Sequence, residues 1–212
     1  MSYDAFATTF SNSRKNLHWP ELEYIIADMK QRGCISVLDV GCGNGRFIEQ
    51  AKISKFHFWE YLGIDSSEWM IREARKLHPD HHFEVIWMQE LWNSSQFSVL
   101  SSQFNCLLFL ASFHHLATRQ ERIQVLQESK KLLTPNGRIY MTNWNLRDQE
   151  RYEASHRWGG EYDIKIGEFS RYYHGFTQGE LAGLFDEAGY QVVENRIFDG
   201  GRNLLSILER ES

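Results

Sequence analysis

A run of alternating glycines that directly follows an apolar, strand-like segment is the feature that most restricts how this chain can fold. Residues 35–40 are largely apolar, and Gly41, Gly43 and Gly45 follow them without a spacer. Glycines at alternate positions let the backbone approach a ligand closely and expose N–H groups at the start of the next helix. A tight strand–helix turn without a ligand also needs glycine, so the surrounding sequence must decide between the two interpretations.

Strand-like and helix-like segments alternate along the chain. Apolar residues at helical spacing predict helices over about 20–32, 66–77, 119–133 and 177–189. Short apolar runs predict strands over 35–40, 61–64, 83–88, 105–110, 138–142, 190–197 and 203–208. Such alternation favours a parallel sheet with helices on both faces, here an α/β, Rossmann-like, doubly wound sheet of seven strands. The two strands that close the chain form a hairpin, so the last strand is expected to be antiparallel.

The length of the chain and its unbroken pattern predict one domain over residues 1–212. The three prolines, Pro20, Pro79 and Pro135, do not mark a linker, and no repeat divides the chain. Pro135 with the next two residues is expected to form a turn before the strand at 138–142. The alternation lapses over 145–173, which is polar and aromatic. Because long irregular loops in compact domains are usually functional, we expect an inserted, lid-like segment there.

Composition excludes several classes of protein. The net charge of −5 argues against a DNA-binding protein held by bulk positive charge. The three cysteines, Cys34, Cys42 and Cys106, form no Cys-x-x-Cys pair, so a disulfide framework, a structural zinc site and any other metal site are not expected. No signal sequence or membrane-spanning run is visible, and we expect a soluble protein in the reducing cytoplasm.

Two carboxylates accompany the glycine motif. Asp39 precedes it, and Asp65 ends the next strand, where a carboxylate typically accepts both hydroxyls of a ribose. A nicotinamide dinucleotide site would place its third glycine at position 46, which is Arg46. The motif therefore favours a nucleoside ligand that carries an amine for Asp39 over a dinucleotide with a pyrophosphate.

These residues resemble the class I S-adenosylmethionine (SAM) methyltransferases. The resemblance implies that SAM is the cofactor and S-adenosylhomocysteine the product. It also implies that Asp39 and the glycine backbone face the methionine moiety, Asp65 the ribose, and the segment after residue 87 the adenine. The cofactor-binding residues expected on this basis are Asp39, Gly41, Gly43, Gly45, Asp65, Gln89, Glu90 and Leu110.

Narrower motifs flank this core. They are Phe10-Ser-x-x-Arg14, Trp19-Pro20, His114-His115-Leu-x-Thr118, Arg171-Tyr172-Tyr173-His174 and the segment 199–203. Together they resemble the tRNA wobble-uridine methyltransferases that esterify 5-carboxymethyluridine. The resemblance runs from about residue 10 to residue 209. It implies the anticodon loop of tRNA as partner, with a small zinc-containing activator protein as a second partner of some members.

A carboxylate acceptor is already a nucleophile at neutral pH, so catalysis can come mainly from positioning. The candidate catalytic residues are Arg14, Arg46 and His114, which would hold the carboxylate. Adjacent histidines on a loop point in different directions, so at most one of His114 and His115 is expected to act. The candidate substrate-binding residues are Trp144, Arg171, Tyr172, Tyr173 and His174. Each also has an ordinary explanation, as a solvated charge or a packing ring.

Two other functions fit the same motifs. One is methylation of a small-molecule carboxylate or another metabolite on the same fold. The other is a non-catalytic, SAM-binding subunit that activates or scaffolds another protein. Label transferred to small molecules would identify the first, and SAM binding without turnover would identify the second.

Overall fold

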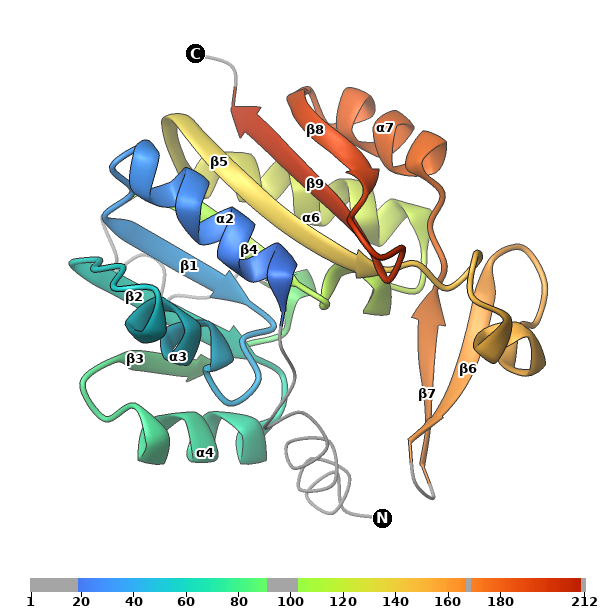
Figure 1. Cartoon of the computed structure of the whole chain (residues 1–212), viewed down its shortest axis with the longest axis horizontal. Helices are drawn as coiled ribbons and strands as arrows, with labels where there is room; N and C mark the ends of the chain where they lie inside the picture. The colour runs from blue at the N-terminus through green and yellow to red at the C-terminus, as the bar shows by residue number, and fades with distance from the viewer. Residues whose placement is uncertain (1–18, 91–102, 167–168, 211–212) are drawn as a thin grey trace.

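The computed structural model describes residues 19–90, 103–166 and 169–210. Within these ranges, seven strands form one sheet in the order β3-β2-β1-β4-β5-β9-β8 (Figure 1). The strands are β1 Ser36–Val40, β2 Glu60–Asp65, β3 His82–Val85, β4 Phe104–Leu110, β5 Leu133–Trp144, β8 Tyr190–Ile197 and β9 Asn203–Arg210. β9 runs antiparallel to both β5 and β8, and the pairs among β1–β5 are parallel. The predicted fold class is therefore confirmed, including the antiparallel last strand.

The helices cover both faces of this sheet (Figure 1). They are α2 Pro20–Gln31, α3 Arg46–Ile53, α4 Glu68–Leu77, α6 Arg119–Leu132 and α7 Gln178–Glu187, with short 3-10 helices η1 Met88–Glu90, η2 Phe113–His115 and η3 Glu150–Ser155. Side-chain oxygens cap three of the helices, as the sequence favours. Ser67 accepts from Met70 N, Thr118 forms a capping box with Glu121, and Thr177 accepts from Glu180 N.

Alternation along each strand divides the apolar side chains between two cores. In β1, Leu38 and Val40 join the core that contains α6 and α7, whereas Val37 joins the core that contains α2, α3 and α4. A sheet covered on both faces explains why its strands read as nearly continuous apolar runs. Among the described residues, no helix combines the length and the apolar character that crossing a membrane requires.

β5 begins earlier than the sequence suggested. The expected turn at Pro135–Gly137 does not stand apart from the strand, because α6 passes straight into extended chain at Leu133. The pairing of β4 with β5 shifts between Phe104, opposite Leu133, and Cys106, opposite Arg138. The turn residues are thus absorbed as an irregularity inside one long strand, with Asn136 at a φ of 61°.

The segment 145–173 is more regular than expected. After η3 it forms a hairpin of β6 Glu161–Ile166 and β7 Phe169–His174, which stands beyond the carboxyl ends of the parallel strands (Figure 1). Leu146, Tyr162, Ile164 and Tyr173 form a small core of their own there. That this segment moves as a lid stays a prediction.

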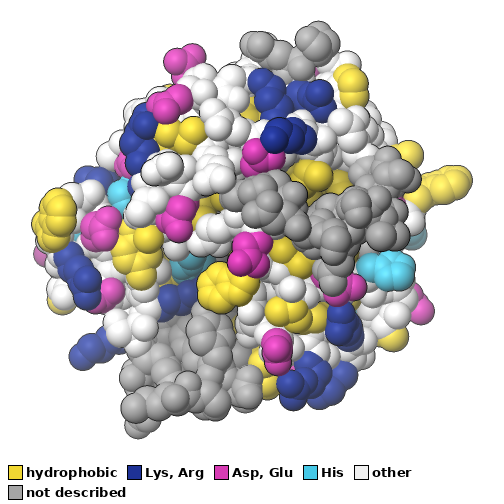
Figure 2. Space-filling view, turned by 180° about the vertical axis from the view of Figure 1, so that it is seen from behind, with side chains coloured by type: hydrophobic (Ala, Val, Ile, Leu, Met, Phe, Trp, Pro, Cys, Tyr) yellow, Lys and Arg dark blue, Asp and Glu magenta, His cyan; other side chains and the backbone are white. Residues whose placement is uncertain are grey.

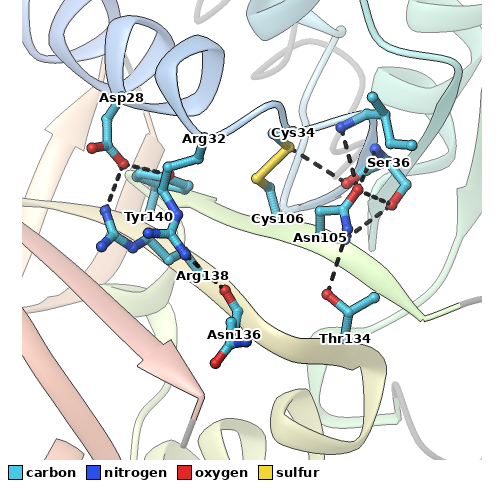
Figure 3. Close-up of a disulfide and its surroundings, with 11 residues drawn as sticks. Asp28, Arg32, Cys34, Ser36, Asn105, Cys106, Thr134, Asn136, Arg138 and Tyr140 are labelled. Atoms are coloured by element: carbon cyan, nitrogen blue, oxygen red, sulfur yellow. Dashed lines mark hydrogen bonds and ion pairs between the residues drawn. A yellow bond between two sulfur atoms is a disulfide. The ribbon is translucent and has the colours of Figure 1, made fainter. Parts of the chain in front are cut away.

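A disulfide joins Cys34 to Cys106, contrary to the expectation from cysteine spacing (Figure 3). The two residues are 72 positions apart in sequence, and they meet because β1 and β4 are neighbours in the sheet. Cys42 is a free, buried thiol. Beside the disulfide, the side-chain oxygen of Asn105 accepts from the backbone and hydroxyl of Ser36 (Figure 3). Spacing along a chain does not reveal pairs that only sheet order creates.

His78 ends α4 directly behind the glycine loop. It is 4% exposed, and neither ring nitrogen has a hydrogen-bond partner among the described residues. Burial lowers the pKa of His78 from 6.5 to about 4, and the charges of Lys52 and His81 act in the same direction. The unfolded chain therefore binds this proton at a higher pH than the folded protein, so the free energy of unfolding falls as pH drops through this window.

We predict that His78→Phe reduces the loss of stability between about pH 6.5 and pH 4. Phenylalanine removes the titrating group but keeps a ring beside Phe83 and Gly45. Urea unfolding at the two pH values measures the effect, and the variant should lose less free energy of unfolding than the wild type. The exposed His82→Gln control should behave like the wild type. Equal losses in the wild type and His78→Phe would contradict the prediction.

Candidate active site

The glycine loop between β1 and α3 is wedged against two neighbouring segments. A Cβ at Gly41 would lie 2.4 Å from the Cβ of Ser112, and one at Gly45 would lie 2.7 Å from the His78 ring. Both glycines also have positive φ, 78° and 82°. Glycine is needed here on both grounds, close approach and backbone conformation. The loop is thus packed closely between Ser112, just after β4, and His78, just after α4.

Asp65, at the end of β2, fixes this loop. One carboxylate oxygen accepts from Gly43 N at 3.0 Å, and the other accepts from Ser67 N at 2.9 Å. Burial raises the pKa of Asp65, although the two backbone bonds and the charge of Arg171 oppose that rise. Each carboxylate oxygen has a second lone pair, so Asp65 can still accept hydroxyl groups of a ligand.

Asp39, in β1, is buried and only partly satisfied. Its Oδ2 accepts from the Tyr61 hydroxyl at 2.9 Å, whereas Oδ1 has no hydrogen-bond partner among the described residues. Burial raises the pKa of Asp39 to about 7; the Tyr61 bond opposes the rise and the charge of Asp65 adds to it. An orphaned buried carboxylate oxygen is costly. A ligand with an ammonium group would satisfy it.

A cavity of about 260 Å³ lies over these groups. Asp39, Asp65 and the glycine loop form its polar side, and Met70, Ile86, Met88 and Leu110 are among its apolar residues. The cavity therefore offers two carboxylates, exposed backbone and an apolar wall, which suit the amine, the ribose and the adenine of SAM. In the described ranges, no group of three or more His, Cys, Asp or Glu side chains is arranged to hold a metal ion.

Cations and aromatic rings also line the cavity. Arg46, the first residue of α3, lies with its guanidinium 4.5 Å from the ring centroid of Trp19. Its Nη1 is buried and has no hydrogen-bond partner among the described residues. Burial lowers the pKa of Arg46. Arg171 and Tyr172 reach the cavity from β7, so the hairpin contributes to the wall of the site.

Most of the predicted cofactor residues reach this cavity. The predicted site residues that line it are Asp39, Gly41, Gly43, Arg46, Asp65, Gln89, Leu110, Arg171 and Tyr172. Gly45 and Glu90 belong to the same loops but are not among its lining residues. Arg14 lies outside the described residues.

Four other predicted residues, His114, Trp144, Tyr173 and His174, are not among the residues that line the cavity. His114 is fully buried, and its Nδ1 accepts from Trp144 N at 3.3 Å. Tyr173, 1% exposed, stacks on Trp144 with ring centroids 4.9 Å apart. His174 is within 2.6 Å of Glu180 through Nε2. In this arrangement these side chains pack the hairpin against the sheet.

Sequence reasoning did not single out several residues of the cavity as site residues. His115, and not His114, faces the cavity, together with Leu116, Ser112 and Trp19. The Nδ1 of His115 is 3.1 Å from the carbonyl oxygen of Tyr172. The paired histidines and the Trp-Pro motif were visible in the sequence. Which histidine faces inward depends on the turn η2, which the sequence did not predict.

The seven-stranded sheet and the cavity at its carboxyl edge define the class of SAM-dependent methyltransferases. A family model described as a methyltransferase domain matches residues 11–195, and the chain belongs to that family. The structure resembles a SAM-dependent methyltransferase from Clostridium acetobutylicum, with a TM-score of 0.73, 10% identity and 99% of each chain covered. It also resembles the SAM-bound amino pentose methyltransferase CalS10, with a TM-score of 0.67, 17% identity, and 99% of this chain and 98% of that chain covered. That enzyme comes from Micromonospora echinaspora. The prediction of a SAM-dependent methyltransferase is confirmed.

Two of the relatives found by sequence carry names that specify the substrate as well as the class of enzyme. The chain is 24% identical to a tRNA (carboxymethyluridine(34)-5-O)-methyltransferase of Schizosaccharomyces pombe, over 91% of this chain and 88% of that protein. It is 24% identical to a putative methyltransferase of Encephalitozoon cuniculi, over 98% and 93%. A mouse protein with the same tRNA activity in its name, ALKBH8, is 25% identical over 72% of this chain and 21% of its own length.

We predict that SAM binds most tightly between about pH 7 and pH 8. Below this window Asp39 gains a proton and no longer attracts the α-ammonium group; above it, the amine itself loses its proton. Isothermal titration calorimetry should show affinity at least about 10-fold weaker at pH 5.5 than at pH 7.5.

The control for this prediction is Asp39→Asn, which has no carboxylate to protonate. Its SAM affinity should be weaker at pH 7.5 and should fall less than that of the wild type down to pH 5.5. Circular dichroism at each pH would verify that both proteins remain folded. A wild-type affinity that does not change over the acidic range would contradict the role given to Asp39.

Proposed function

We propose that this methyltransferase esterifies the carboxymethyl group of a modified wobble uridine in tRNA. Two relatives named for this reaction support the proposal, one of them matched over most of both chains. The observation that carries it is a cation at the cavity, Arg46, whose buried Nη1 has no partner among the described residues. A carboxylate acceptor would supply the missing partner.

This methyl transfer does not require a strong general base. Bound SAM would supply an electrophilic methyl group on a positively charged sulfur. An oxygen of the acceptor carboxylate forms a bond to the methyl carbon as the sulfur–carbon bond breaks, which leaves a neutral ester and a neutral thioether. No proton moves in this step. The protein therefore has to position the carboxylate and exclude water.

Arg46 and Arg171 are the described arginines that line the cavity, and we assign them to the acceptor. A guanidinium binds a carboxylate through two parallel hydrogen bonds, which fixes the plane of the carboxylate as well as its place. Arg14 keeps its proposed role of holding the acceptor carboxylate. We call this set of arginines, Arg14, Arg46 and Arg171, the carboxylate clamp. Of the two histidines, we assign the acceptor side to His115 in place of His114, because His115 lines the cavity.

An extruded base would meet aromatic rings at this side of the cavity. Bases of single-stranded RNA are commonly recognised by stacking on aromatic side chains. Tyr172 and Trp19 line the cavity and could take this part, whereas Tyr173 and Trp144 stack on each other. tRNA as substrate also implies a cytoplasmic protein.

Charge is the observation that favours a second candidate, a small-molecule carboxylate as acceptor. The net charge is −5, and Figure 2 shows Lys and Arg side chains interspersed with Asp and Glu over the face that it presents. Phosphate binding normally uses clustered cations. A tRNA acceptor would therefore be bound through a local basic patch or through a partner that adds basic surface. The resemblance to the wobble-uridine enzymes implies a small activator protein in the place of such a partner, without fixing its charge.

The proposal is tested by methyl transfer to tRNA from a strain that lacks this protein. Purified protein, labelled SAM and an extract of that strain are incubated, since the extract can supply an activator. Nucleoside mass spectrometry should show carboxymethyluridine converted to its methyl ester. If tRNA stays unlabelled and the small-molecule fraction gains label, the second candidate replaces the first. SAM binding without transfer to either fraction would favour a non-catalytic subunit.

We predict that Arg46→Lys slows methyl transfer by about 10²-fold and leaves SAM affinity nearly unchanged. Lysine keeps the charge but cannot form the two parallel bonds. The measurements are initial rates on tRNA and calorimetry with SAM. Lys52→Ala, in the last turn of the same helix, serves as the matched control and should transfer methyl groups at the wild-type rate. Wild-type rates of methyl transfer from both Arg14→Ala and Arg46→Ala would refute the proposal that these arginines hold the acceptor carboxylate.

A further inference from the structure

Arg122, on the first turns of α6, is buried at 4% exposure although it carries a charge. It does not line the cavity. A buried arginine is expensive unless its hydrogen-bond donors are used. The groups that accept hydrogen bonds from Arg122 belong mainly to segments that do line the cavity, the one after η2 and β7.

The first set of partners lies just after η2. Nε and Nη2 of Arg122 donate to the carbonyl oxygen of Leu116, at 3.1 and 2.9 Å, and Nη2 donates to the carbonyl oxygen of Ala117 at 3.1 Å. Leu116 and its neighbour His115 line the cavity. The guanidinium therefore fixes the backbone that carries His115.

The second set of partners belongs to the hairpin. Nη2 of Arg122 is 3.3 Å from the hydroxyl of Tyr172. That hydroxyl has two possible acceptors for its single proton, Ala117 O and a carboxylate oxygen of Glu161, each at 3.2 Å. The carbonyl oxygen of Tyr172 lies 3.1 Å from Nδ1 of His115. Tyr172 is thus held at both ends, by Arg122 at its hydroxyl and by His115 at its backbone.

The third set of partners comes from α7 and the segment before it. Nη1 of Arg122 is 3.6 Å from Glu180, which is 2.6 Å from His174 of β7. The guanidinium lies 5.2 Å from the ring centroid of Phe176. One side chain therefore joins η2, β7 and α7, and the residues it holds are those of the acceptor side of the cavity.

We propose that Arg122 is a positioning residue that docks the β6–β7 hairpin and the η2 turn into one rigid acceptor wall. None of its hydrogen bonds and ion pairs within the described ranges goes to Asp39, Asp65 or the glycine loop. Its loss should therefore loosen the acceptor side and spare the cofactor side. The inference rests on the proposed function only for the choice of acceptor.

The experiment compares Arg122→Met with Arg119→Met, a change on the same helix at an exposed arginine paired with Glu187. Hydrogen exchange should be at least about 5-fold faster at residues 169–174 of Arg122→Met, with β1 and β4 unchanged. SAM affinity should stay within about 3-fold of wild type, and kcat for methyl transfer should fall by about 10- to 100-fold. Arg122→Lys should recover only part of kcat, because lysine cannot reach all these acceptors at once. Arg119→Met should match the wild type throughout.

A second variant keeps the test decisive if Arg122→Met does not fold. Tyr172→Phe removes only the hydroxyl that meets Arg122, and it should speed exchange in the hairpin in the same way. Unchanged hairpin exchange in the folded variants would overturn the proposal. So would loss of SAM affinity together with faster exchange across the whole sheet, because that result indicates a general structural role. If wild-type protein fails to methylate tRNA, the acceptor assignment fails, while exchange and SAM binding still judge Arg122.

Discussion

The hold of Asp65 on the glycine loop is the interaction on which the rest of the site depends. By accepting from Gly43 N and Ser67 N, one carboxylate joins the first and second strand–helix turns. Gly41 and Cys42 add hydrogen bonds from their backbone N–H groups to the carbonyl oxygen of Ile64. The ends of β1 and β2 are thereby held in one arrangement, and the buried Asp39 lines the cavity beside this fixed loop.

Local sequence patterns were enough to predict the turns at the ends of β1 and β2. The apolar run at 35–40, the glycines after it and Asp65 one strand later all act through residues close in sequence. Strand alternation and helix capping by Ser67 and Thr177 are equally local. For such features, sequence order and spatial order agree, so the fold class and the position of the glycine loop beside Asp65 follow from the order of residues alone.

Features that depend on long-range packing could not be derived in this way. The disulfide between Cys34 and Cys106 exists because β4 pairs with β1 across an intervening segment of the chain. The choice between His114 and His115 depends on how the η2 turn meets β7. The hairpin went unnoticed because its apolar residues belong to a small cluster that is separate from the two cores of the main sheet.

The two halves of the site differ in how they are built, and this bears on their functions. The half proposed for the cofactor is built around the glycine loop and two aspartates of adjacent strands, Asp39 and Asp65, and it would bind a ligand that every turnover shares. The acceptor half is assembled from η2, β7 and α7, and their contacts pass through long side chains such as Arg122, Glu180 and Tyr172. Rigid elements tolerate change in the loops they carry. Related chains can therefore keep the first half and rebuild the second, so acceptor identity has to be argued from the residues of the hairpin and its docking contacts, and not from the glycine loop.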